Sequence, residues 1–259
     1  MLLLSALTAI GINSALEMQE KCVINTAWFP RPPYQYLNQR RKPDGFDIQF
    51  IQAIGKKLNC TVNVVQRNWG RQDSFAVEGR QDIILGSMDW DENVDYYVSD
   101  AYRSDPVGAY WNGPIANEDI EKGLTQLLNE GYKFAFRRYL HENEEFEKVL
   151  SSPRFKRQIL SVDNDFGVIS HLKKGRIKGA FLHLATAEEF LKSHGRDNIY
   201  FNKKLSYDNP ASLLLAINSP LGQEFLERLN KAIEALKADG TIKKLEEKYL
   251  NGYTIDSVK

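Results

Sequence analysis

The stretch Gly79–Tyr102, GRQDIILGSMDWDENVDYYVSDAY, decides how the rest of the chain is interpreted. Gly79-Arg80 ends a short helical run, and Asp82–Leu85 is an apolar run of strand length. Gly86-Ser87 then ends that run. A continuous apolar run between turn signals predicts a strand that is covered on both faces, as in a parallel sheet flanked by helices.

The residues that follow this strand carry polar chemistry. In open α/β sheets, ligands bind just beyond the carboxyl ends of the strands. That position holds a bare backbone, a hydroxyl, a carboxylate and an indole, which together are typical of a polar small-molecule site. The alternative is an ordinary exit from a strand into a loop. The residues at this position after the strand are Gly86, Ser87, Met88, Asp89 and Trp90.

Length and composition limit the classes of protein. A chain of 259 residues forms one large domain or two lobes of roughly 100 to 130 residues each. Its 34 basic residues balance 34 acidic ones, so the net charge gives no reason to expect nucleic acid or an anionic membrane as a partner. A hydrophobic content of 42% with 26% charged residues is typical of a globular protein.

The N-terminus has the character of an export signal. Met1–Ala15 is apolar and uncharged, and a polar segment, Glu17–Lys21, follows it. This apolar stretch is too short to span a membrane and has the length of a secretory signal core. We expect residues 1–20 to be a signal peptide and leader, and the mature protein to be periplasmic. The alternative is a buried or amphipathic N-terminal helix.

The chain has two cysteines, Cys22 and Cys60, and each stands at the start of a predicted strand. If these strands are parallel neighbours joined by one helix, both cysteines lie at the same edge of the sheet, within reach of a disulfide. The alternative is two unrelated buried thiols. Two cysteines and four scattered histidines show no metal-ligand spacing, so we expect no metal and no cofactor.

Strands and helices alternate through the first part of the chain. Val23–Thr26 and Thr61–Val65 read as strands, and Ile48–Leu58 between them is an amphipathic helix. This alternation predicts a parallel sheet with right-handed crossovers. The proline-rich loop after the first strand is stiff, and its aromatic residues either stack on a ligand or cover the edge of the core. Those residues include Trp28 and Tyr34.

The second part repeats the pattern. Gly175-Arg176 ends a helix and precedes an apolar strand, as Gly79-Arg80 does. Two such lobes would face each other across a cleft, where small-molecule sites are common. We expect lobe 1 to comprise residues 21–110 and 208–259, and lobe 2 residues 111–207, with hinge strands near 107–111 and 207–214. Polar side chains that follow the strands of lobe 2 are Arg138, Tyr139 and His183.

The ordered set of these features resembles the extracellular solute-binding proteins of family 3, over about Cys22 to Leu250. The resemblance implies a two-lobed type II periplasmic binding protein fold of class α/β. Each lobe is then a mostly parallel sheet flanked by helices, and a two-strand hinge joins them. The matching pieces are PPY at 32–34, GFDI at 45–48, GRQDII at 79–84, VSDAY at 98–102, LKADGT at 236–241 and EKY at 247–249.

Two departures from the family pattern concern the ligand. The amino-acid binders that this chain resembles have an arginine that clamps the ligand carboxylate, and at that position this chain has Glu92. His183 falls near the position of the acidic residue that usually binds the ligand amine in that family. A guanidinium fork fits a carboxylate, and its loss weakens that contact. With Asp89, Asp91 and Glu92 in place, we expect standard α-amino acids to bind weakly. The ligand should tolerate or require positive charge near Asp89.

The resemblance implies a function without catalysis. We expect a periplasmic receptor that closes around a small polar, amino-acid-like or nitrogenous solute for uptake by an ABC importer. The partner is then an importer permease or a membrane sensor, and the receptor is a monomer. Two alternatives are a solute sensor without a cognate transporter and a cyclohexadienyl-dehydratase-like enzyme, for which Asp89, Glu92 and His183 could exchange protons.

Overall fold

The computed structural model describes residues 22–87, 95–137, 144–162, 164–250 and 252–258, and in them the chain builds two large sheets. The first sheet has six strands, in the order β4-β1-β5-β13-β6 with β7 paired to β13. In it, β1 is parallel to β4 and β5, whereas β13 is antiparallel to its neighbours. The strands are β1 (Val23–Trp28), β4 (Thr61–Gln66), β5 (Ile83–Ser87), β6 (Tyr96–Val98), β7 (Arg103–Ser104) and β13 (Pro210–Ala216).

The second sheet has five strands, in the order β10-β9-β11-β8-β12. Here β9 is parallel to β10 and β11, and β8 is antiparallel to β11 and β12. A small ribbon pairs β2 (Tyr36–Leu37) with β3 (Pro43–Asp44). The strands of the second sheet are β8 (Val107–Asn112), β9 (Phe134–Arg137), β10 (Ile159–Val162), β11 (Gly179–His183) and β12 (Ile199–Tyr207).

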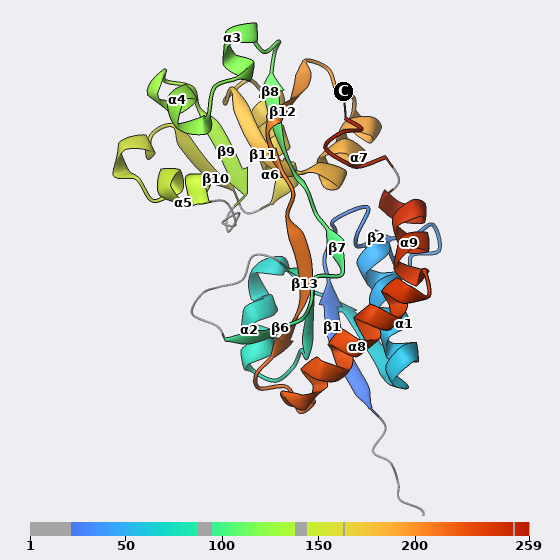
Figure 1. The fold of residues 1–259 in the computed structure, drawn as a ribbon. Helices are drawn as coiled ribbons and strands as arrows, with labels where there is room; N and C mark the ends of the chain where they lie inside the picture. Colours follow the sequence, from blue (N-terminus) through green and yellow to red (C-terminus); the bar gives the residue numbers. More distant parts are fainter. Residues whose placement is uncertain (1–21, 88–94, 138–143, 163, 251, 259) are drawn as a thin grey trace, which may run out of the picture.

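Helices cover both sheets, and Figure 1 shows the two lobes that result. In the first lobe these are α1 (Phe46–Leu58), α2 (Gln72–Val77), α8 (Glu224–Ala238) and α9 (Thr241–Leu245), with single turns at Trp69–Arg71 and Glu246–Leu250. In the second they are α3 (Asn117–Ile120), α4 (Leu124–Asn129), α5 (Glu144–Leu150), α6 (Asp165–Lys173) and α7 (Leu184–His194), with a turn at Pro153–Phe155. The two-lobed α/β class is confirmed, with mixed rather than mostly parallel sheets.

Two crossings connect the lobes. Residues 105–106 lead from β7 to β8, and residues 208–209 lead from β12 to β13. The crossings lie side by side, because the Asp105 N–H donates to the Asn209 carbonyl over 2.6 Å. A strand that enters from the other lobe runs against the parallel strands, which explains the mixed sheets. The lobe boundaries expected after residues 110 and 207 fall beside these crossings and stay a prediction.

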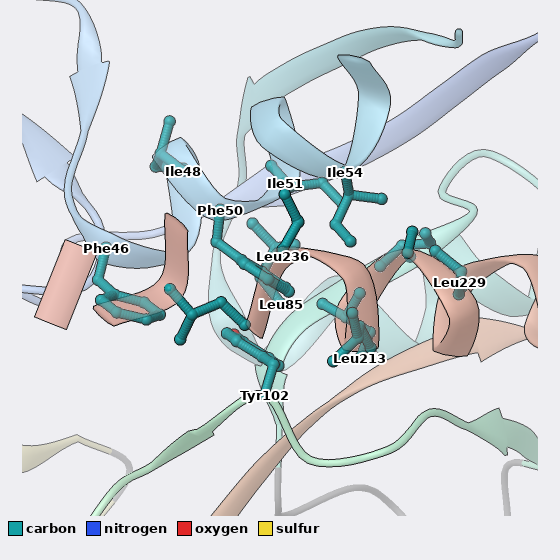
Figure 2. Close-up of a cluster of buried hydrophobic side chains, with 14 of the residues drawn as sticks. Phe46, Ile48, Phe50, Ile51, Ile54, Leu85, Tyr102, Leu213, Leu229 and Leu236 are labelled. Carbon is teal, nitrogen blue, oxygen red and sulfur yellow. The ribbon is translucent and has the colours of Figure 1, made fainter. Parts of the chain in front are cut away.

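The core of the first lobe forms where α1 lies against α8, as Figure 2 shows. Apolar residues of α1 recur at helical spacing, and their side chains are buried. Gly45 precedes the helix with φ 115°, and a Cβ there would lie 2.3 Å from the Tyr34 carbonyl oxygen. Only glycine fits this close approach, which fixes the loop before α1 against the helix.

The disulfide expected from the sequence is confirmed. Cys22 precedes β1 and Cys60 precedes β4, and the two strands are parallel with Val23 opposite Thr61. Both cysteines therefore stand at the amino edge of the first sheet and are bonded to each other.

No helix among the described residues has both the length and the apolar character needed to cross a bilayer.

Candidate functional site

Charged side chains gather in the interior of the protein where the two lobes meet. Asp105 in the first crossing lies at the centre of this group, and it is fully buried. It accepts hydrogen bonds from the Arg31 guanidinium and from the Tyr34 hydroxyl, the latter over 2.8 Å. The Nη1 atom of Arg103 lies 3.1 Å from Asp105 Oδ2, the same oxygen that Arg31 contacts. Arg31 and Tyr34 belong to the proline-rich loop after β1, so this loop is fastened to the hinge.

A second carboxylate, Asp47, extends the group toward α1. Arg103 donates two hydrogen bonds to it, from Nε to Oδ1 over 2.8 Å and from Nη2 to Oδ2 over 3.2 Å. Tyr102 and Gln35 donate to the same carboxylate over 2.7 and 3.0 Å. Asp47 stands in the first turn of α1, where the helix dipole favours negative charge.

Gly86 at the end of β5 makes room for this pair. Its φ is 58°, and a Cβ at this position would lie 2.5 Å from Arg103 Nη2 and 2.6 Å from Asp47 Oδ2. Its carbonyl oxygen accepts a hydrogen bond from Arg31 Nη1 over 3.4 Å. A glycine is therefore required here both for its backbone conformation and for the close packing of the ion pair.

The second lobe contributes through the ends of β9 and β11. His183 ends β11 and is 1% exposed, with its Nδ1 atom 3.3 Å from Asp165 Oδ2. Its Nε2 atom lies 3.9 Å from Asp105 Oδ2, which brings the two lobes into electrostatic contact. Arg137, the last residue of β9, approaches the same imidazole, with Nη1 3.2 Å from Nδ1. We name these buried ionisable side chains the interlobe charge cluster: Arg31, Asp47, Arg103, Asp105, Arg137, Asp165 and His183.

Burial and charge act in opposite directions on these carboxyl groups. Burial alone would raise the pKa of Asp105, but the charges of Arg31 and Arg103 hold its pKa well below the ordinary value of 3.8. Burial likewise opposes ionisation of Asp165, and His183 outweighs it through its charge and a hydrogen bond, which lowers the pKa of Asp165 to about 2. Both carboxylates are thus ionised at neutral pH.

The shift at Asp165 predicts how stability depends on pH. A carboxyl group whose pKa is lower in the folded state stabilises the fold above its unfolded pKa of 3.8, and loses that effect as pH falls toward 2. We expect Asp165→Asn to lower the free energy of unfolding by about 2 kcal/mol at pH 7 and by about half of that at pH 3. Urea titrations of both proteins at pH 7, 5, 4 and 3 measure the difference. A difference that stays constant over this range contradicts the prediction.

The structure describes some of the site residues expected from the sequence, and the others lie outside the described residues. Gly86 and His183 lie in or against the interlobe charge cluster, and Tyr34 holds its central carboxylate. Trp28 ends β1 and is 2% exposed within the hydrophobic core, so its ring faces are covered by protein, as are those of Tyr34. Ser87 ends β5. Asp89, Trp90, Arg138 and Tyr139 lie outside the described residues, so their roles in binding stay a prediction.

The two lobes touch beside this cluster. Ala185, in the first turn of α7, is 1% exposed and belongs to the same buried hydrophobic cluster as the core of the first lobe. The Leu184 N–H donates to the Pro106 carbonyl in the first crossing over 2.7 Å. Within the described residues, no group of three or more acidic, histidine or cysteine side chains is arranged to hold a metal ion.

Comparison with known proteins identifies relatives for nearly the whole chain. The family model of bacterial extracellular solute-binding proteins, family 3, matches residues 25–252. The chain is 23% identical over 221 residues to the ABC transporter arginine-binding protein 1 of Escherichia coli, covering 84% of this chain and 86% of that protein. It is 23% identical over 228 residues to the L-cystine-binding protein TcyA of Bacillus subtilis, covering 84% and 76%.

A solved structure supports the fold in the same way. A histidine kinase sensor domain with similarity to periplasmic binding proteins superposes with a TM-score of 0.69 at 18% identity, covering 90% of this chain and 96% of that one. At this identity the likeness concerns the fold alone. The shared two-lobed fold places the interlobe charge cluster between the lobes, at the hinge.

Proposed function

Because the chain belongs to the bacterial extracellular solute-binding proteins of family 3, we propose that it is a periplasmic receptor that closes around a small polar, nitrogenous solute for an ABC importer. The observation that carries this proposal is the interlobe charge cluster, to which both lobes and a crossing contribute. A solute bound between the lobes would contact all three and would stabilise the closed arrangement. Residues 1–20, the proposed signal peptide, lie outside the described residues.

One donor in the cluster is available to a solute. Arg31 is 3% exposed, and its Nε atom has no hydrogen-bond partner among the described residues. A buried donor without a partner costs free energy, and a ligand oxygen or nitrogen acceptor would remove that cost. The atom belongs to a side chain that also contacts Gly86 at the carboxyl end of β5, the edge of the sheet where ligands of such folds bind.

Two arginines of the cluster, Arg31 and Arg103, are poorly suited to clamp a free carboxylate. Asp105 occupies Arg31 Nη2, and Asp47 occupies both Nε and Nη2 of Arg103. A carboxylate ligand would have to displace one of these aspartates before it could form a two-point contact. This supports the expectation from the sequence that plain α-amino acids bind weakly. The preference for a head group with positive charge near Asp89 rests on the sequence, because Asp89 lies outside the described residues.

A matched pair of ligands tests the proposal. Arginine and agmatine differ only by the α-carboxylate, so their affinities isolate the contribution of that group. We expect agmatine to bind at least about tenfold more tightly than arginine in isothermal titration calorimetry, because a repelled carboxylate costs about 1.4 kcal/mol or more. A thermal-shift series of polyamines and other small amines extends the comparison to further nitrogenous solutes.

Two outcomes separate the parts of this proposal. Binding of any small amine that is lost in Asp89→Ala supports both the receptor function and the charge preference. Tight binding of arginine that is unchanged in Asp89→Ala keeps the receptor function but overturns the charge preference. We further propose that the receptor acts as a monomer and catalyses no reaction.

A further inference from the structure

The C-terminal segment provides a third connection between the lobes. After the turn that ends at Leu250 in the first lobe, residues 252–258 run toward α7 of the second lobe, and Figure 1 shows this dark-red segment beside that helix. We call residues 252–258 the strap. It is separate in sequence from both crossings.

Tyr253 joins the two lobes through one side chain. Its ring packs against the buried hydrophobic cluster that unites the core of the first lobe with Ala185 of α7. Its hydroxyl donates a hydrogen bond to the Glu189 carboxylate on α7 of the second lobe. Burial and the neighbouring Glu189 both raise the pKa of Tyr253, so the hydroxyl keeps its proton and remains a donor at neutral pH.

The remainder of the strap is held in a compact turn. The Ser257 N–H donates to the Thr254 carbonyl, and the Thr254 N–H donates to the Ser257 hydroxyl over 2.9 Å. The turn presents Asp256 to Lys203 of β12, and the two form an ion pair. The strap therefore contacts the second lobe at two consecutive elements, α7 and β12.

The strap also passes the hinge. A pocket of about 420 Å³ lies between the strap and the crossings, and its lining includes Pro106 and Asp208 from the crossings and Thr254 and Ile255 from the strap. Rotation of the lobes about the crossings changes the distance between the first lobe and α7. Any such rotation must stretch or break the contacts that the strap makes with the second lobe.

We propose that the strap is a clasp that holds the lobes together before a ligand binds. The two contacts differ in strength. The Lys203–Asp256 pair is largely exposed, at 64% and 83%, and exposed pairs contribute little. The Tyr253–Glu189 bond is charge-assisted and only partly exposed, so it carries most of the effect. Holding the closed arrangement in advance raises the apparent affinity for a ligand, because a larger fraction of the protein is competent to bind.

The test measures the distance between the lobes without any ligand. Both native cysteines are in the disulfide, so cysteines introduced at Val77 in the first lobe and Lys174 in the second are the only free thiols for paired spectroscopic labels. Both positions are exposed. We expect Tyr253→Phe to raise the ratio of open to closed molecules about three- to tenfold in the full-length protein, as loss of one partly exposed hydrogen bond predicts.

Controls distinguish a clasp from a merely structural contact. Tyr200→Phe removes a hydroxyl from a half-exposed tyrosine on β12 and should leave the distance distribution unchanged. Glu189→Ala should match Tyr253→Phe, and the double variant should open no further, because both changes remove the same bond. A folded Tyr253→Phe protein with the wild-type distribution overturns the proposal. The proposal rests on the proposed function only in requiring that the lobes open, so a failed ligand prediction leaves this test intact.

Discussion

Replacing Asp105 with asparagine should lower the free energy of unfolding by about 3–5 kcal/mol, because it leaves buried positive charge without a partner. Arg31 is 3% exposed and Arg103 is 5% exposed, and both contact the Asp105 carboxylate. Asn keeps the shape of the side chain but carries no charge. Arg103 retains Asp47 as a partner, so the uncompensated charge is that of Arg31.

A second substitution separates charge from packing. Arg31→Gln combined with Asp105→Asn removes both members of the pair and leaves the Arg103–Asp47 pair balanced. We expect this double variant to recover at least half of the stability lost by Asp105→Asn alone, since replacing a buried ion pair costs less than breaking one. Urea unfolding at pH 7 of the wild type, the single variant and the double variant gives the free energies for this comparison.

Asp100 provides the matched control for this change. It is exposed, and Asp100→Asn should alter the free energy of unfolding by no more than about 0.5 kcal/mol. A loss below about 1 kcal/mol for Asp105→Asn, with no recovery in the double variant, would mean that solvent reaches the cluster and screens its charges. That result would also count against the proposal that a solute binds at the interlobe charge cluster.

Local signals in the sequence predicted the scaffold of the first lobe. The apolar run before Gly86 is β5, and the amphipathic segment from Ile48 to Leu58 is α1, which begins two residues earlier at Phe46. The alternation of strands and helices also placed Cys22 and Cys60 at one edge of the sheet. These features depend on periodicity and turn residues close together in the chain, so sequence alone contains them.

The interlobe charge cluster was harder to predict, because its pairs join residues that are far apart in the chain. Arg31 and Asp105 are separated by 74 positions, and nothing near either residue marks the other as its partner. A usable signal was present in the segment just before the hinge strand expected near 107–111. Charged residues in a short crossing between two cores are buried, and burial of a charge is costly unless the charge is paired. Arg103 and Asp105 both occur there.

The nine-residue strand β12 was not expected from the sequence. It spans Ile199–Tyr207 and contains Lys203 and Lys204, and its pairing with β8 shifts register between Asn202 and Tyr207. A strand at the edge of a sheet exposes one side to solvent and tolerates charge, so its apolar pattern is weak. Between the crossings, α3 and α4 are two short helices with Gly123 before the second.

Removing the disulfide should cost about 4 kcal/mol of stability without altering the interlobe charge cluster. The bridge joins residues 38 positions apart, and closing a loop of this length in the unfolded chain accounts for a loss of that size. Both cysteines also pack against the core of the first lobe. We therefore expect a double variant, Cys22→Ala with Cys60→Ala, to unfold at a clearly lower urea concentration than the oxidised wild type.

The position of the bridge makes this prediction selective. Cys22 and Cys60 stand at the amino edge of the first sheet, whereas Trp28 and Gly86 stand near its carboxyl edge, about 20 Å away along β1. The double variant should thus keep the ligand affinity of the wild type at temperatures where both are folded. Reductant should destabilise the wild type to the level of the variant and leave the variant unchanged. Equal unfolding midpoints for the oxidised wild type and the variant would contradict the expected stabilisation by the bridge.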